Sequence, residues 1–355
     1  MNKTELASLY ESLGAPEFVR RVNELLETRE IKPDEISVRG LYEATTKTGI
    51  RPVSEAAIDT TAFSGILGNM VFAAMKSAYE TASFIGDKLV DTLKSSEPTE
   101  SVPGTTTPAG PEAVAEGEPY PETGFGALSY ETSATKKGRL LWITREAVMR
   151  DRTGLILRQA ADIGRYIAYE RELTILTAIQ DLNGSAYKPN GTPVALYSSG
   201  NANIKESNAL VDYTNIEAAR RILAAMTDDR GRKLLVDPKI LLVPDALETT
   251  ARMIIGAAYI DRTSGESSET GTTSANPFQD RFSVLASPLL SSDSDWYLGD
   301  FKRQFVWHEV WPLSVERAPD NHPKRFTHDI IAGYKGSYYG GAAAVDCRYV
   351  VKCSS

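Results

Sequence analysis

The feature that most constrains this chain is a long stretch with helical spacing, from Thr153 to Gln180. Its apolar residues mostly recur three or four positions apart, which is the period of one face of an α-helix. No proline interrupts the stretch, and beyond Gly154 at its very start Gly164 is its one weak helix former. As a single helix it would extend for about 40 Å at ~1.5 Å per residue. The chain is therefore expected to be organised around an extended spine.

The segment before this stretch, residues 95–135, has the composition of a chain without a core of its own. It contains six prolines and seven glutamates and not one lysine or arginine, which is typical of a disordered linker. Its second half nevertheless carries spaced aromatic residues, and Ser129–Thr135 alternates as a strand does. The residues alone leave two alternatives open: a linker, or an arm that docks on its own body or on a neighbouring chain.

Composition excludes several classes of protein. The 355 residues, 42% hydrophobic and 24% charged, are typical of a globular chain with two or more domains. A net charge of −8 without a Lys/Arg block disfavours tight binding to nucleic acid, although a mildly acidic wall is compatible with enclosing DNA. Two cysteines, Cys347 and Cys353, exclude a disulfide framework and favour a reducing compartment. With no signal-peptide core and no apolar run near ~18 residues, the chain is expected to be soluble and cytoplasmic at synthesis.

Local patterns predict an α+β fold with helices first and strands last. Residues 1–60 predict short helices, one of which starts at Pro16, and residues 61–93 are again mostly helical. A capping box at residues 214–217 opens a helix to Ala225. Residues 239–243 predict a short buried strand, after which Pro244 opens another helix. We expect a flexible loop at residues 261–276 and β-strands with glycine-bearing turns in the remainder.

No constellation of residues predicts an enzyme. His308 falls in a predicted strand, where a half-buried structural role is expected, and no nucleophile lies beside His328 and Asp329 in the sequence. The chain has no HExxH, CxxC, EF-hand, GxSxG or Walker motif, so neither a metal nor a cofactor is expected. The glycines from Gly333 to Gly341 lead into a strand rather than a helix N-terminus, so they predict a glycine-bent strand and not a phosphate loop.

Several stretches, taken in order along the chain, carry a resemblance to a known family. They are TAFSGILGNMVFAAMKSAYE, AEGEPYPETGFGALSYETSATKKGRLLWITREAVMRD, LLVPDALETTARMII and NPFQDRFSVLASPLLSSDSDWYLGD. This order resembles the major capsid proteins of tailed bacteriophages, which have the Hong-Kong-97-type fold, and is most similar to the Mu-like major head subunit family. The resemblance spans roughly residues 61–355, and residues 1–60 match nothing in it.

The resemblance implies a division of the chain into five parts. Residues 1–94 would form an N-terminal helical region and arm, and residues 95–138 an extended loop. Residues 139–182 would carry the spine helix of a peripheral domain. Residues 183–290 would form an axial domain, and residues 291–355 the peripheral-domain sheet and C-terminal strands.

The resemblance also implies a shell protein of the virion, with assembly as its mechanism and no enzymatic activity. Hexamers and pentamers of the chain would close into an icosahedral head around double-stranded DNA in the host bacterial cytoplasm. Scaffold, portal and decoration proteins would be further partners, with no sequence-specific DNA binding and no membrane. The extended loop would lie across the adjacent subunit, its acidic run facing lysine or arginine there. Its candidate contact residues are Glu112, Glu116, Glu118, Tyr120, Phe125 and Tyr130.

Two departures from the family pattern lead to further expectations. Some members crosslink a loop lysine to a neighbour's asparagine, but residues 95–135 contain no lysine, so we expect non-covalent shells. Some members lose an N-terminal segment by cleavage, whereas a chain beginning at Met1 is expected to be uncleaved. The nearest alternative is an encapsulin-type compartment that encloses a cargo enzyme, and an uncharacterised hydrolase is the alternative from another class.

Overall fold

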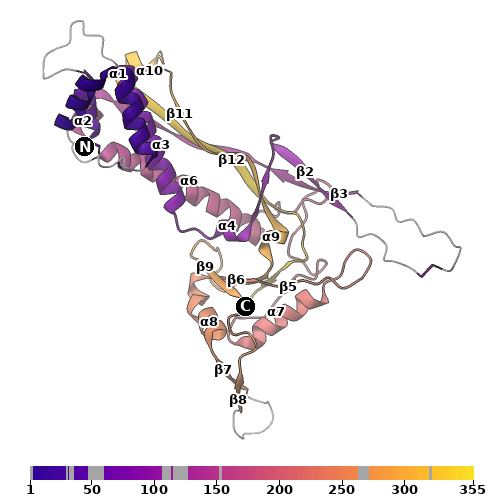
Figure 1. Ribbon diagram of the computed structural model, residues 1–355. Coiled ribbons are helices and arrows are strands. Elements are labelled where there is room, and N and C mark those ends of the chain that lie inside the picture. The colour runs from indigo at the N-terminus through magenta and orange to yellow at the C-terminus, as the bar shows by residue number, and fades with distance from the viewer. Residues whose placement is uncertain are drawn as a thin grey trace. The chain divides into compact units, whose positions relative to one another are not determined.

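The computed structural model describes residues 3–28, 31, 36–46, 60–105, 113–114, 127–151, 154–262, 272–319 and 322–355 (Figure 1). The chain divides into two compact units, each assembled from separate segments of the sequence. The first unit comprises Met1–Phe84, Lys136–Glu170 and Trp311–Tyr339. The second comprises Ile85–Thr135, Arg171–Val310 and Gly340–Ser355. Helices and strands are mixed in the chain, as the sequence predicts.

Three N-terminal helices begin the first unit: α1 (Lys3–Glu27), α2 (Val38–Thr46) and α3 (Thr60–Thr81). The helix α1 is broken at Gly14, whose φ of 72° lies outside the helical region. Pro16 therefore stands at the start of a new helical segment, where its fixed φ is favourable. Buried residues of the three helices, including Phe18, Leu41 and Phe63, belong to one apolar cluster. The apolar spacing in residues 1–81 thus reflects the core of this unit.

The predicted spine is confirmed as α6 (Leu155–Gln180), a helix of 26 residues. Its start is fixed by Asp151, whose carboxylate accepts a hydrogen bond from Leu155 N at 2.8 Å. A Cβ atom at Gly164 would lie 2.2 Å from the carbonyl oxygen of Met75 in α3. The one weak helix former of the spine is therefore required where the backbones of α6 and α3 approach each other.

A four-stranded sheet has the strand order β1-β11-β12-β4. Its strands are β1 (Asp91–Lys94), β4 (Thr135–Thr144), β11 (Phe305–Arg317) and β12 (Ile330–Ala344), and two short helices, α5 (Arg145–Arg150) and α10 (Lys324–Thr327), follow β4 and precede β12. In the first unit, Ile143 of β4 and Tyr334 of β12 belong to the helical cluster. Residues 330–344 form one strand, which confirms the strand expected there.

The second unit contains a five-stranded sheet with the order β5-β13-β10-β6-β9. Its strands and the helices of this unit are β5 (Ile204–Lys205), β6 (Ile240–Pro244), β9 (Ser283–Ser287), β10 (Trp296–Gly299), β13 (Val350–Cys353), α4 (Gly86–Leu89), α7 (Tyr213–Ala225), α8 (Asp245–Gly256) and α9 (Phe301–Gln304). Leu223 of α7, Leu241 of β6 and Ala251 of α8 share a core with Trp296. The indole Nε1 of Trp296 donates to Asn208 O at 2.8 Å, so its buried donor is satisfied.

Two antiparallel hairpins complete the second unit. In the first, β2 (Thr99–Thr105) pairs with β3 (Ala127–Ser133), from Thr99 opposite Ser133 to Thr105 opposite Ala127. In the second, β7 (Tyr259–Arg262) pairs with β8 (Thr272–Ala275). The prediction of a flexible loop at residues 261–276 is therefore wrong at both ends of that range, where the chain forms strands. The serine, threonine and glycine of that stretch suggest a loop, but Tyr259, Ile260 and the threonines at the start of β8 are good strand formers that pair across the intervening residues.

Three further expectations need correction. The capping box of α7 is formed by Asp212 and Asn215, two residues before the predicted one, because the aspartate side chain reaches Thr214 N at 2.8 Å. The stretch expected to remain helical to residue 93 ends as the strand β1. His308 is fully buried rather than half-buried.

Candidate assembly surfaces

The arm predicted to make contacts between subunits is described only at its base. Glu112, Glu116, Glu118, Tyr120 and Phe125 lie outside the described residues, whereas Tyr130 lies in β3. The strands β2 and β3 form a two-stranded ladder of their own, which agrees with a segment that has no core. We call the described pair β2–β3, residues 99–105 and 127–133, the arm base.

The arm base is attached to the body of its own unit on one side. The ring of Tyr130 stacks on that of Tyr187, with 5.8 Å between the centroids. The backbone N–H of Glu131 donates to Lys188 O at 3.1 Å, and Asn190 N donates to Ser129 O at 2.7 Å. The side chains of Lys188 and Glu131 form an ion pair at 3.6 Å. Tyr130, one of the predicted inter-subunit residues, thus has an intrachain partner in this structure.

A second attachment joins the arm base to β11. Thr132 Oγ1 donates to Glu100 O at 3.2 Å and lies 3.1 Å from Nδ1 of the fully buried His308. A hydroxyl has one hydrogen and a carbonyl can only accept, so both bonds form when His308 Nδ1–H donates to Thr132. The histidine is therefore a structural anchor of the arm base. No local pattern could have indicated this, because the two residues are 176 positions apart.

Burial changes the pKa values of the two stacked tyrosines, Tyr130 of the arm base and Tyr187. Burial raises the pKa of Tyr130, and it raises that of Tyr187 much further. Because the charged phenolate is the disfavoured form, both rings are neutral at neutral pH. The stacked pair contributes packing rather than acid–base chemistry.

The first unit presents a second candidate surface on one face of its sheet. Along β12, Tyr334 belongs to the helical cluster and Gly336 lies against Ile167 and Met75. Successive strand residues point to opposite faces, so Gly333, Lys335, Ser337 and Tyr339 lie on the face turned away from that cluster. This face is the site of the contacts described next.

Each of two tryptophans on this face has a lysine ammonium group over its indole ring. Lys136 Nζ lies 5.1 Å from the ring centroid of Trp311, and Lys324 Nζ lies 4.9 Å from that of Trp142. Tyr339 meets Trp311 edge-on at 4.8 Å. Both lysines are exposed, and neither forms an ion pair with any residue that the structure describes. A cation over an indole face is held by the ring quadrupole and remains available to an anion.

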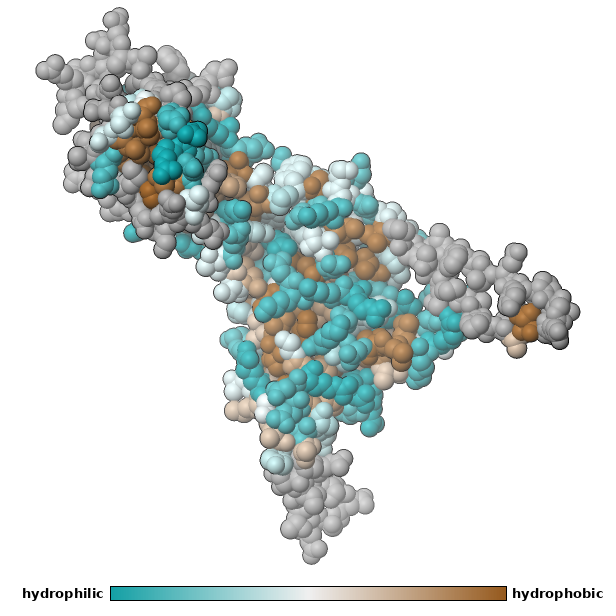
Figure 2. All heavy atoms as spheres, in the orientation of Figure 1, coloured by the Kyte–Doolittle hydropathy of each residue, from teal (hydrophilic) through white to brown (hydrophobic). Residues whose placement is uncertain are grey.

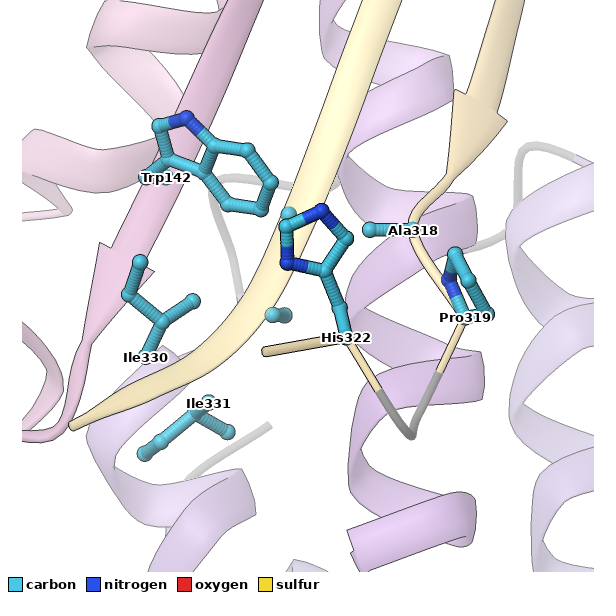
Figure 3. A pocket seen from close by; sticks show the side chains of 8 residues that line it. Trp142, Ala318, Pro319, His322, Ile330 and Ile331 are labelled. Carbon is cyan, nitrogen blue, oxygen red and sulfur yellow. The ribbon is translucent and has the colours of Figure 1, made fainter. Parts of the chain in front are cut away.

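The same face contains one internal ion pair and a small pocket. Lys335 Nζ lies 2.5 Å from Glu316 Oε2. Lys335 lowers the pKa of Glu316, and the nearby positive charge of Lys136 lowers it further. His322 lies 5.2 Å from Trp142 between ring centroids, and both line a pocket with Ala318, Pro319 and residues 330–333 (Figure 3). A Cβ at Gly333 would lie 2.2 Å from Trp142 Cζ3, so the indole lies directly on the β12 backbone. We call Lys136, Trp142, Trp311, Glu316, Lys324, Lys335 and Tyr339 the lysine–tryptophan face.

Large apolar side chains are also exposed on each unit, where they interrupt the hydrophilic surface (Figure 2). Tyr166 of α6 is 68% exposed in the first unit, and Leu235 is 94% exposed in the second. Others are Leu140, Leu155, Val211, Met253 and Tyr259. Scattered apolar residues are normal on a monomer. Each unit nevertheless exposes several large apolar side chains that an interface between copies could bury.

The described residues hold little that suggests chemistry. Among them, no three His, Cys, Asp or Glu side chains gather as a metal site. No helix in the described ranges has the length and apolarity to cross a bilayer. Cys353 is buried, and burial raises its pKa to about 12, while burial also raises the pKa of Cys347. Both thiols are therefore protonated and weakly reactive.

Comparison with known proteins identifies the family. The family model described as "Phage capsid protein" matches residues 129–353. The chain belongs to the phage capsid protein family. It is thus a structural protein of the bacteriophage virion, a major capsid protein, and the family gives no support to an enzymatic role. No curated protein matches its sequence significantly.

One solved structure is similar enough to compare the fold. The capsid structure of the cyanophage P-SCSP1u is similar with a TM-score of 0.50 and 10% identity, covering 75% of this chain and 85% of that one. This likeness shows that the capsid protein has a mixed helix and sheet fold found in phage capsids. Mycobacterium phage Bobi gives a TM-score of 0.49 at 13% identity, over 76% of this chain and 90% of the other. The structure of a virus-like particle from Pyrococcus furiosus gives a TM-score of 0.45 at 8% identity, over 80% of this chain and 98% of the other. The family match does not favour the encapsulin alternative.

Proposed function

We propose that this capsid protein is the major head subunit of a tailed phage and that its copies close into an icosahedral shell around double-stranded DNA. The observation that carries the proposal is the family match over residues 129–353, which include the spine, the five-stranded sheet and three of the four strands of the other sheet, β4, β11 and β12. The arm base supports it, because a paired ribbon without a core of its own is suited to bury its surface against another copy. The mechanism is assembly, and no residue is assigned a catalytic role.

The finer assignment follows the Hong-Kong-97-type arrangement and the Mu-like subfamily. Residues 1–94 are the N-terminal region, 95–138 the extended loop, 139–182 and 291–355 the peripheral domain, and 183–290 the axial domain. The extended loop lies across the adjacent subunit, with Glu112, Glu116, Glu118, Tyr120 and Phe125 as its contacts. Hexamers and pentamers form in the host cytoplasm with scaffold, portal and decoration proteins as partners.

A sedimentation experiment tests the assembly. Purified protein at micromolar concentration and physiological salt, supplied with any natural scaffold, should sediment as large particles that appear as closed shells in negative stain. Nuclease treatment of particles from infected cells should leave an enclosed DNA intact. A single sharp monomer boundary would contradict the shell, and shells that contain a cargo enzyme in place of DNA would favour the encapsulin-type compartment.

A further inference from the structure

The N-terminal helices α1 and α2 lie outside the part of the chain that the family match covers, residues 129–353. They nevertheless belong to the first compact unit, together with Lys136–Glu170 and Trp311–Tyr339 of the matched part. We call α1 and α2, with the described residues between them, the N-terminal cap. The places of its apolar side chains indicate what the cap does in the subunit.

The apolar side chains of the cap form part of a core that the cap shares with the rest of the unit. Every buried apolar residue among the described residues of the cap belongs to the cluster that also holds residues of α3, β4, α5, α6 and β12. Four of them, Leu6, Phe18, Val22 and Leu41, have no exposed surface. The cap therefore completes the core of the unit and does not build a separate one.

Direct contacts join the cap to the helices that follow it. The helix α1 contacts α2 and α3, and α2 also contacts α3 and α5 (Figure 1). The ring of Tyr42 in α2 meets that of Phe63 in α3 edge-on, with 5.1 Å between the centroids. Val148, the buried residue of α5, belongs to the same cluster. The cap thus covers apolar side chains of α3 and α5 that would otherwise face water.

The opposite side of α1 is polar. Glu17 pairs with Arg20, and Arg21 pairs with Glu24, within the same helix. All four side chains are about half exposed or more. One side of α1 therefore faces the core and the other faces solvent, which is the pattern of an outer helix of a packed domain.

A segment as short as the cap cannot readily fold by itself. Chains below about 40 residues rarely bury enough apolar surface to be stable without a disulfide, a metal or a partner. The body of the unit has the complementary problem, because without the cap it would expose a contiguous apolar surface of the kind that leads to aggregation. Each part supplies the surface that the other needs.

We propose that the N-terminal cap is a fixed part of this capsid protein and stays bound to the first unit even when the chain between α2 and α3 is cut. The apolar side of α3 and α5 is thus an interface whose occupant is the protein's own N-terminal segment. One consequence rests on the proposed function. A segment that stays bound cannot be shed as a scaffold, so a scaffold for the shell would be a separate protein.

A cut in the connection tests the proposal. A recognition sequence for a site-specific protease, flanked by glycine–serine spacers, is inserted between residues 46 and 60, and the purified protein is cut under native conditions. We expect the N-terminal fragment to elute with the remainder in size-exclusion chromatography and to separate only in denaturant. An unchanged thermal midpoint before cutting shows that the insertion is tolerated. If it is not, residues 1–53 and 54–355 are coexpressed as two chains and purified through a tag on one of them.

Substitutions in the cut protein identify the contact that retains the fragment. Phe18→Ala should weaken retention at least about tenfold, because a buried ring is removed from the shared core. Leu13→Ala, in the same helix at a site that is 38% exposed, is the matched control and should retain the fragment as wild type does. Leu41→Ala replaces Phe18→Ala if that variant does not fold. The release of the fragment after dilution measures retention.

Particles from infected cells provide a second measurement. Mass spectrometry should detect peptides from residues 3–46 in the same amount as peptides from the spine, residues 155–180. Particles that lack the N-terminal peptides would overturn the proposal.

Two results with the cut protein would also overturn it. One is release of the fragment from a remainder that keeps its thermal midpoint, and the other is equal retention in Phe18→Ala and Leu13→Ala. The cut protein is measured below the concentration at which shells form, so these results do not depend on assembly. Wild type that forms no particles would contradict the proposed function and leave the result of the cut unaffected.

Discussion

At the scale of single residues, two glycines mark opposite requirements in the helices of the first unit. Gly164 lies in α6 where a Cβ would be 2.2 Å from the backbone oxygen of Met75, and such an atom cannot move without shifting α3. Gly65 lies inside α3, and a Cβ there would meet nothing within 4 Å. One glycine is required by a helix contact, and the other only weakens its helix.

We therefore expect opposite signs for the same substitution. Gly164→Ala should lower the free energy of unfolding by about 1–3 kcal/mol or more, because overpacking displaces a backbone. Gly65→Ala should raise it by about 0.5–1 kcal/mol through helix propensity. Urea denaturation of both variants measures this, and equal effects of the two substitutions would show that α6 and α3 do not approach as described.

Glu172 is a second residue with a measurable consequence. Its buried carboxylate accepts hydrogen bonds from Gly86 N at 2.8 Å and Ile85 N at 3.2 Å. Desolvation raises its pKa, against the lowering effect of these two bonds. The folded state therefore binds the proton more tightly than the unfolded state, so this group's contribution to stability falls as pH rises from its ordinary pKa through the raised one.

Glu172→Gln removes that titration and isolates it. Denaturation curves from pH 4 to 7 should show the stability advantage of wild type over this variant shrinking as pH rises, because only the wild-type group loses its proton. At neutral pH we still expect the variant to be less stable by about 1–3 kcal/mol, since an amide offers one acceptor to two N–H donors. Glu146→Gln, at an exposed site in α5, is the control. An advantage that grows with pH would contradict the assignment.

At the scale of elements, the contacts that attach the arm to its own chain lie in the arm base, apart from residues 106–126, to which we assign the role in assembly. The ladder of β2 and β3, with Tyr130, Glu131 and Thr132 attached to the body, is complete without residues 106–126. Thr105 pairs with Ala127 at the end of the ladder. A two-residue turn would therefore fit between them and close the hairpin.

We expect replacement of residues 106–126 by Asn-Gly to give a folded but assembly-defective protein. The thermal midpoint should change by less than about 2 °C, since the ladder and its attachments remain, whereas particle formation should be lost with the area buried between copies. Sedimentation and a thermal melt on the same sample measure both. Normal particles from the shortened chain would mean that the segment is a passive linker.

The elements also show what sequence can and cannot predict here. The spine is confirmed because the period of α6 is a local pattern of its own residues. The hairpin of β7 and β8 was missed because its pairing joins segments across a polar stretch whose composition suggests a loop. The cap of α7 was misplaced because Asp212 and Thr214 are both good caps, and only packing selects between them. The roles of Thr132 with His308 and of Lys136 with Trp311 depend on contacts between distant segments, for which one sequence contains no signal.

At the scale of the whole molecule, we expect the contacts between subunits to be non-covalent and reversible. Residues 95–135 contain no lysine that could form an amide crosslink with a neighbour. We expect boiled particles to run on a denaturing gel as a single band at the chain mass of 38.8 kDa. A ladder of heavier species that resists SDS and reductant would show a covalent shell and contradict this prediction.

The state of the two thiols has a consequence for how such a particle ages. Burial keeps Cys353 and Cys347 in the protonated form, and thiol oxidation proceeds mainly through the thiolate. A virion outside its host has no reductase to repair it. Its two cysteines should nevertheless stay as free thiols through long exposure to air, so thiol oxidation should not limit the durability of the particle.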